Sequence, residues 1–299
     1  PILDQWVGVP GIFWITAGLA LAAIGIIVFV IPTPVVMKHQ LDTHVEGNVM
    51  ARVLKQADLL RLEYGIFSLH FLLTANFVVL PILLKDHYQL DVSQHWKVYL
   101  PVMLASFFLM LPFIIMAEKR RRMKPVFLSA ILLLAVVQLL LFLVGDGFWL
   151  MLVLILLFFA AFNLLEASLP SLVTKTAPAD AKGTAMGVYS TSQFLGIFAG
   201  GLAGGWMMGN FGLEGVFLLG AIVGAIWFLL ALGMSRPQYL GSILLPLQPM
   251  TLPKTDVLQQ LLRIEGVREA VIIEDVAYLK VDKQQFDPDS VRAFSASYV

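Results

Sequence analysis

Residues 98–145 read VYLPVMLASFFLMLPFIIMAEKRRRMKPVFLSAILLLAVVQLLLFLVG. Two runs without an acidic or basic side chain, 98–117 and 125–145, flank the short basic segment 118–124. Crossing the hydrocarbon core of a bilayer takes about 20 apolar residues, and only a helix satisfies its own backbone hydrogen bonds there. The stretch therefore predicts two membrane-spanning helices joined by a tight basic turn.

The rest of the chain repeats this pattern. Five further runs qualify as spans: 5–37, 64–84, 147–165 (continuing past Glu166 to about Leu169), 183–213 and 215–235. Over all 299 residues, 59% are hydrophobic and 13% are charged, whereas soluble domains carry about 25% charged residues. We predict an all-α polytopic membrane protein with seven spans.

Basic residues alternate between the connections. Segments 38–62, 118–124 and 170–182 hold four, five and two of them, whereas the opposite connections hold only Lys85 and Lys97. Because cytoplasmic loops carry the excess of lysine and arginine, we expect these three segments and the C-terminal tail to lie in the cytoplasm, with the N-terminus outside.

Several functional classes are excluded by what the sequence lacks. There is no cysteine, so no thiolate can act as a metal ligand or nucleophile, and twenty basic residues balance twenty acidic ones, which argues against a nucleic-acid partner. Neither the phosphate-binding pattern GxxxxGK[ST] nor the zinc pattern HExxH occurs. We expect no enzyme activity, no cofactor and no metal site.

Polar residues inside the spans are the best pointers to function, because burying them in a bilayer is costly. Glu166 and Asn163 lie one turn apart on one run, and His70 lies about two turns inside another. Glu166 either binds a proton or a cationic substrate group, or makes a structural hydrogen bond near the cytoplasmic end, to Gln193 or to a helix terminus. His70 either carries protons or contacts a backbone carbonyl.

Small residues recur every four positions in the run 183–213. Gly196, Gly200 and Gly204 fall on one helix face. Such a stripe lets a neighbouring backbone approach closely, so we predict a packing surface. In a transporter the same stripe can also mark surfaces that slide or rock.

The tail carries 15 of the 40 charges and reads as a small soluble domain. We predict a linker and edge strand over 236–252, and a domain over 253–299 with a helix at 256–265, strands at 267–274 and 276–282, and a second helix after Asp287. The order matches a ferredoxin-like α+β fold without its last strand.

Two stretches resemble the major facilitator superfamily. Glu118, followed by Lys119, Arg120, Arg121 and Arg122 at a two-helix hairpin, resembles the loop motif whose acid and arginines latch one conformation, although Glu118 replaces an aspartate and Ile114 replaces a glycine. The sequence 169–193 resembles the connection from helix ten into helix eleven, particularly in the drug-efflux branch.

This resemblance implies that the spans are helices six to twelve of a twelve-helix carrier. Residues 1–37 are then helix six, 38–62 the linker between the halves, and 63–235 the C-terminal six-helix half. We expect an N-terminal half as partner, a bacterial inner-membrane location, proton-coupled efflux of a small molecule, and a regulatory tail. The alternative is a seven-helix receptor or signalling protein with a cytoplasmic sensor domain.

Overall fold

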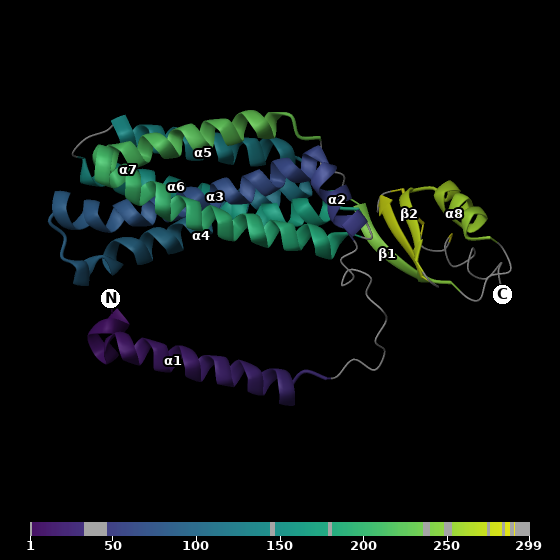
Figure 1. The fold of residues 1–299 in the computed structure, drawn as a ribbon, viewed down its shortest axis with the longest axis horizontal. Helices are drawn as coiled ribbons and strands as arrows, with labels where there is room; N and C mark the ends of the chain where they lie inside the picture. The colour runs from purple at the N-terminus through teal and green to yellow at the C-terminus, as the bar shows by residue number, and fades with distance from the viewer. Residues whose placement is uncertain are drawn as a thin grey trace.

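The protein is a helical bundle with a small α+β unit at one end (Figure 1). The computed structural model describes residues 2–290, apart from 33–46, 144–146, 179–180, 236–239, 248–252, 274–275, 283–284 and 288–289. The bundle region consists of α1 (Ile2–Phe29), α2 (Gly47–Lys55), α3 (Ala57–Ile82), a π-helical turn (Leu83–His87), a 3-10 turn (Val92–Gln94), α4 (Trp96–Lys119), α5 (Met123–Leu143), α6 (Phe148–Thr176) and α7 (Lys182–Leu232). The tail unit consists of β1 (Leu240–Pro246), α8 (Lys254–Arg263), β2 (Val267–Ile273) and β3 (Val276–Asp282).

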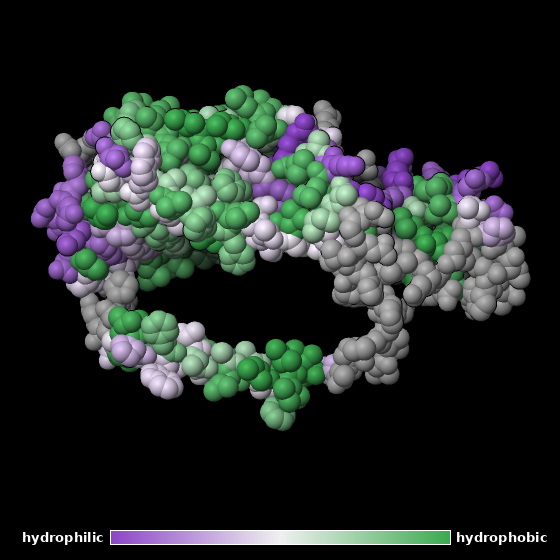
Figure 2. All heavy atoms as spheres, viewed as in Figure 1, coloured by the Kyte–Doolittle hydropathy of each residue, from purple (hydrophilic) through white to green (hydrophobic). Residues whose placement is uncertain are grey.

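The bundle has the surface of a membrane protein. Six of the described helices, α1 and α3 to α7, are long and apolar enough to cross a bilayer. Figure 2 shows apolar side chains along the flank of the bundle and hydrophilic ones gathered at its two ends. This distribution fits an apolar belt between two polar faces, so the predicted polytopic helical fold with a small α+β tail is confirmed.

The longest helix is two rods. At 51 residues and a rise of 1.5 Å per residue, α7 would extend about 76 Å, far more than a hydrocarbon core of about 30 Å. Its backbone breaks at Gly212, whose φ of 71° and ψ of −169° lie outside the helical region and suit only glycine. The two rods run back from this break in opposite directions (Figure 1), as the predicted runs 183–213 and 215–235 require.

The first two spans differ in extent from the sequence expectation. Helix α1 ends at Phe29, and residues 33–46 fall outside the described part of the chain. None of its apolar window is buried, and it lies apart from the bundle (Figure 1). Helix α3 begins at Ala57, so six residues that we assigned to the linker are already helical.

Helix α3 forms the centre of the bundle. It packs most extensively on α7, and five of its leucine and isoleucine side chains are fully buried: Leu59, Leu62, Ile66, Leu69 and Leu72. The absent side chain of Gly65 makes room for the fully buried indole of Trp227, whose Nε1 would lie 3.0 Å from a Cβ atom there. The second rod of α7 is therefore fixed against α3.

The tail sheet has the strand order β1-β3-β2, with both neighbouring pairs antiparallel. This places β3 between two strands connected through α8, a split β-α-β arrangement. On one face Ala277, Leu279 and Val281 are buried with Val257 and Leu261 of α8. The ferredoxin-like assignment remains a prediction, because the expected second helix falls almost entirely outside the described residues.

The opposite face of β3 meets the bundle. Successive strand residues alternate between faces, so Lys280 and Asp282 point away from α8. The Lys280 ammonium donates a hydrogen bond to the carbonyl oxygen of Ala177, where α6 ends, and Asp282 lies 3.7 Å from Arg121. Lys280 is only 5% exposed. The tail unit therefore rests on the end of the bundle formed by the C-terminus of α6 and the α4–α5 turn, hereafter the tail end.

Candidate functional site

A polar cluster lies inside the bundle, toward the tail end. Three helices contribute its members: Glu63 and His70 from α3, Glu166 from α6, and Tyr189, Ser192 and Gln193 from α7. Only three of these residues, His70, Glu166 and Gln193, follow from the sequence prediction. We refer to these six residues as the polar cluster.

His70 connects the three helices. Its Nδ1 atom lies 3.3 Å from the carbonyl oxygen of Ile66, and its Nε2 atom lies 2.8 Å from the side-chain nitrogen of Gln193. The carboxylate of Glu166 lies 3.8 Å from the same Nε2 atom. A neutral imidazole satisfies both close contacts if Nδ1–H donates to Ile66 and Nε2 accepts from the Gln193 amide. This hydrogen-bond network assigns the neutral tautomer with the proton on Nδ1.

Glu166 occupies the open side of the cluster. Its side chain is 36% exposed, yet its Oε2 atom is buried and lacks a hydrogen-bond partner among the described residues. That atom is the one that faces His70. Glu166 is therefore placed to accept a proton from, or form an ion pair with, a protonated His70.

Glu63 is a second acid that the sequence analysis missed. Its side chain is 5% exposed, and within the described chain neither carboxyl oxygen has a partner in normal hydrogen-bond geometry. The Ser192 hydroxyl faces it from α7, and the Tyr189 phenol lies near both Glu63 and Glu166. Burying a carboxylate without partners costs several kcal/mol, so Glu63 is a position at which the cluster can hold a proton or a cation.

The glycine stripe explains why Ser192 and Glu63 meet. A Cβ atom on Gly196 or Gly200 would press on the carbonyl oxygens of Phe67 and Phe71, and one on Gly204 would lie 3.0 Å from the Cα atom of Ala75. Each step of four residues on α7 thus matches a step of four on α3. One turn before Gly196 and Phe67, the same register sets Ser192 against Glu63.

Asn163 does not belong to the cluster. Its amide donates to the hydroxyl oxygen of Ser106 on α4, 3.0 Å away. Residues three apart on a helix are about 60° apart around its axis, which is enough for Asn163 and Glu166 to face different neighbours. Asn163 therefore connects α6 to α4.

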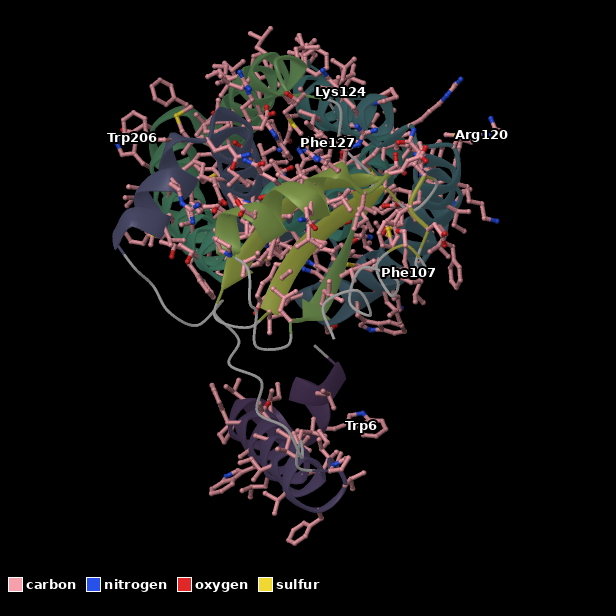
Figure 3. All side chains as sticks on the ribbon, turned by 90° about the vertical axis from the view of Figure 1, so that its right-hand side faces the viewer. Trp6, Phe107, Arg120, Lys124, Phe127 and Trp206 are labelled. Atoms are coloured by element: carbon pink, nitrogen blue, oxygen red, sulfur yellow. The ribbon has the colours of Figure 1, made fainter. Side chains whose placement is uncertain are left out.

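The basic turn between α4 and α5 forms two ion pairs. Glu118 lies 2.9 Å from Lys175 near the end of α6, and Arg121 pairs with Asp282 of the tail unit. Lys119, Arg120 and Arg122 are exposed, and Arg120 extends away from the bundle (Figure 3). The predicted loop motif is thus divided between a contact to α6, a contact to β3, and cationic groups left at the surface.

No cluster of three or more histidine and acidic residues suited to a metal ion occurs among the described residues. The acids and histidine of the polar cluster are better placed for proton exchange than for metal ligation, since Glu63 is separated from His70 by two helical turns on α3.

Glu63 could have been found from its spacing. It lies seven residues before His70, which puts both on one face of a helix. The predicted span 64–84 begins one residue after Glu63, because it was defined by the absence of charge, and that criterion leaves out an acid near the start of a helix. Ser192 and Tyr189 carry no comparable signal, because hydroxyl groups are common in membrane helices.

Membrane-length apolar helices that carry a polar cluster on three of their number define a polytopic membrane protein. The Major Facilitator Superfamily model matches residues 62–264. The chain therefore belongs to this superfamily, as the resemblance of its hairpin and glycine-striped helix implied.

Three curated relatives are similar to this chain. The inner membrane transport protein YajR of Escherichia coli (strain K12) is 41% identical over 287 residues, which are 95% of this chain and 63% of YajR. The uncharacterized transporter BU466 of Buchnera aphidicola subsp. Acyrthosiphon pisum is 30% identical over 203 residues, 67% of this chain and 51% of that protein. An uncharacterized transporter of Buchnera aphidicola subsp. Schizaphis graminum is 35% identical over 238 residues, which are 77% of this chain and 59% of that protein. The chain thus spans between 51% and 63% of the length of these relatives, all of which are described as transporters, and this favours the transporter over the receptor.

Proposed function

We propose that the chain forms the C-terminal half and the tail domain of a secondary active transporter of the bacterial inner membrane. The transporter exports a small molecule in exchange for protons. The superfamily match and the transporter descriptions of the relatives support the general class. One observation carries the proton coupling: His70 lies between Gln193 and Glu166, on three different helices, inside a membrane-length bundle.

The coupling follows from the two states of an imidazole. In the neutral state His70 accepts from the Gln193 amide, which ties α3 to α7. Protonation puts a hydrogen on Nε2, which then can no longer accept a hydrogen bond from the Gln193 amide nitrogen. The protonated Nε2 can instead donate to the Glu166 carboxylate. At about 4 Å and an effective dielectric constant of 20, such an ion pair gains at most about 4 kcal/mol. This gain is sufficient to draw α6 toward α3 when a proton binds.

Glu63 provides a second protonatable group in the same cluster. Its burial without a normal hydrogen-bond partner favours a bound proton, or a cationic group of the cargo at the site that Ser192 and Tyr189 border. A cationic drug-like molecule and protons would then compete for Glu63 and Glu166. Such competition is the basis of exchange transport.

The N-terminal half is expected to cover two exposed faces. Only 11% of the apolar window of α4 is buried, and the first rod of α7 exposes a row of large apolar side chains: Phe194, Leu195, Phe198, Leu202 and Trp206. The polar cluster is carried by α3, α6 and this same rod of α7. A second six-helix half packed there would close the cluster into a central cavity that opens alternately to either side.

The tail domain is proposed to be cytoplasmic and regulatory. Its end of the bundle carries the basic turn, in line with the positive-inside rule. Because Lys280 and Asp282 contact α6 and the α4–α5 turn, the domain would bias the movement of this half.

The experiment is transport by the intact protein in proteoliposomes with an imposed pH gradient, using ethidium as the cationic probe and an internal pH dye. Wild type should exchange ethidium for protons, and Glu166→Gln and His70→Ala should abolish proton movement. Glu214→Gln removes an exposed acid at the far end of the bundle and serves as the matched control. Unchanged proton movement in both cluster variants would contradict the coupling.

A further inference from the structure

A groove with apolar walls opens between α4 and α5. Both helices pack on α6 much more than on each other, so a space of about 430 Å³ remains between them, within the range of about 300–1,000 Å³ typical of ligand sites. Its lining comes from all three helices and the turn, and includes Phe113, Arg122, Leu133, Ala160 and Ala161.

The depth of the groove matches one leaflet of a bilayer. From Met123 at the tail end to Leu133, α5 rises about 15 Å, half of a hydrocarbon core of about 30 Å. Ala160 and Ala161 of α6 form a floor with short side chains, and Phe113 on the α4 wall is 47% exposed. An extended hydrocarbon chain fits such a space, whereas a compact polar solute does not.

The mouth of the groove is cationic. Arg122 lines it, and within the described chain it has no acidic side chain within 4 Å. Lys119 and Arg120 are exposed beside it. Other charges of the turn are engaged, since Glu118 pairs with Lys175 and the Lys124 ammonium donates to the carbonyl oxygens of Leu232 and Met234. The surplus at the mouth is therefore positive.

We propose that this groove binds one anionic phospholipid, such as phosphatidylglycerol, in the leaflet at the tail end. The acyl chain lies between α4 and α5 over the alanine floor, and the headgroup phosphate accepts hydrogen bonds from the Arg122 guanidinium, with Lys119 and Arg120 adding charge. Arginine suits a phosphate because its planar donors can bind two oxygens at once. The lipid takes the place of a direct contact between α4 and α5, and thereby stabilises the hairpin.

The first test uses native mass spectrometry and thermal unfolding of the delipidated intact protein. Phosphatidylglycerol should bind with a stoichiometry of one and raise the unfolding temperature, and Arg122→Gln should weaken that binding about tenfold, as expected for loss of a charge-assisted hydrogen bond. Lys97→Gln removes an exposed base at the other end of α4 and should change nothing. Equal binding of phosphatidylcholine, or no effect of Arg122→Gln, would overturn the proposal. So would stabilisation by inorganic phosphate alone, because it would assign the site to a free anion.

The second test locates the acyl chain. A small fraction of phosphatidylglycerol with brominated acyl chains in phosphatidylcholine should quench the fluorescence of Phe113→Trp more strongly than that of Leu132→Trp. Leu132 is a 45% exposed residue of α5 outside the groove lining. Equal quenching in the two variants would mean that the lipid does not occupy the groove, whatever the effect of Arg122→Gln.

Discussion

The Lys280 ammonium of β3 donates a hydrogen bond to the carbonyl oxygen of Ala177, the residue that follows α6. Glu269 of β2 lies 3.1 Å from the same ammonium group. A charged side chain that is 5% exposed requires such partners, because burial without them is costly. Lys280 therefore connects the tail sheet to the membrane bundle.

Lys280→Met should loosen this connection. The substitution removes the donor to Ala177 and the ion pair with Glu269, so we expect a loss of about 1–3 kcal/mol at the contact. Hydrogen exchange in β3 and at the end of α6 should increase, while the α8-facing core of the tail unit stays protected. Arg263→Met, an exposed base on α8, is the control and should leave the exchange of both segments unchanged.

Gly200→Ala should destabilise the bundle. A Cβ atom at this position presses on the backbone of Phe71, and overpacking of this kind costs about 1–3 kcal/mol. A Cβ atom at Gly205, five residues further along, would meet no atom within 4 Å, so Gly205→Ala should be neutral or stabilising. The unfolding temperatures of the two variants in detergent check the prediction, and equal temperatures would argue against backbone contact between α3 and α7.

Gly212→Ala should weaken the turn between the two rods of α7. A Cβ atom added to Gly212 would meet no atom within 4 Å. The cost therefore arises from the backbone alone, and is about 1–3 kcal/mol for a conformation that only glycine adopts readily. Gly209→Ala changes a helical glycine that is equally free of neighbours and should raise stability slightly. The measurement is the free energy of unfolding of each variant, which should be lower for Gly212→Ala than for Gly209→Ala.

Glu63 should react with dicyclohexylcarbodiimide. This apolar reagent modifies protonated carboxyl groups in apolar surroundings, and the burial of Glu63 without a normal partner provides both conditions. Mass spectrometry should find the adduct on Glu63, and Glu63→Gln should remove it. The exposed Glu214 should react instead with a water-soluble carbodiimide, and labelling of Glu214 alone by both reagents would contradict the assignment.

The sequence was sufficient for the helices and the strands. The apolar runs predict α3 to α7 because membrane spans require continuous hydrophobicity, and the alternation at 267–282 predicts β2 and β3. Residue periodicity also points to Glu63 on the same face as His70. The sequence could not reveal that the Asn163 side chain contacts Ser106 on α4 whereas the Glu166 side chain faces His70 on α3. The partner of each side chain depends on which helices pack beside α6.

The docking of the tail could not be derived from the sequence either. Lys280 and Asp282 alternate with apolar residues like any exposed strand face, and nothing local distinguishes them from solvated charges. Their partners, Ala177 and Arg121, lie more than 100 residues away in the chain.

The glycine contacts between α3 and α7 have a mechanical consequence. Helix α3 and the first rod of α7 run parallel, and their backbones are in contact at every fourth residue. They cannot slide past each other by less than one helical turn without a clash, so they should move as one rigid unit. Glu63 and His70 on α3, and Ser192 and Gln193 on α7, would therefore keep their mutual spacing throughout the proposed transport cycle. Glu166 lies on α6, outside this unit. The distance between its carboxylate and the His70 imidazole is therefore the one that can change when α6 moves.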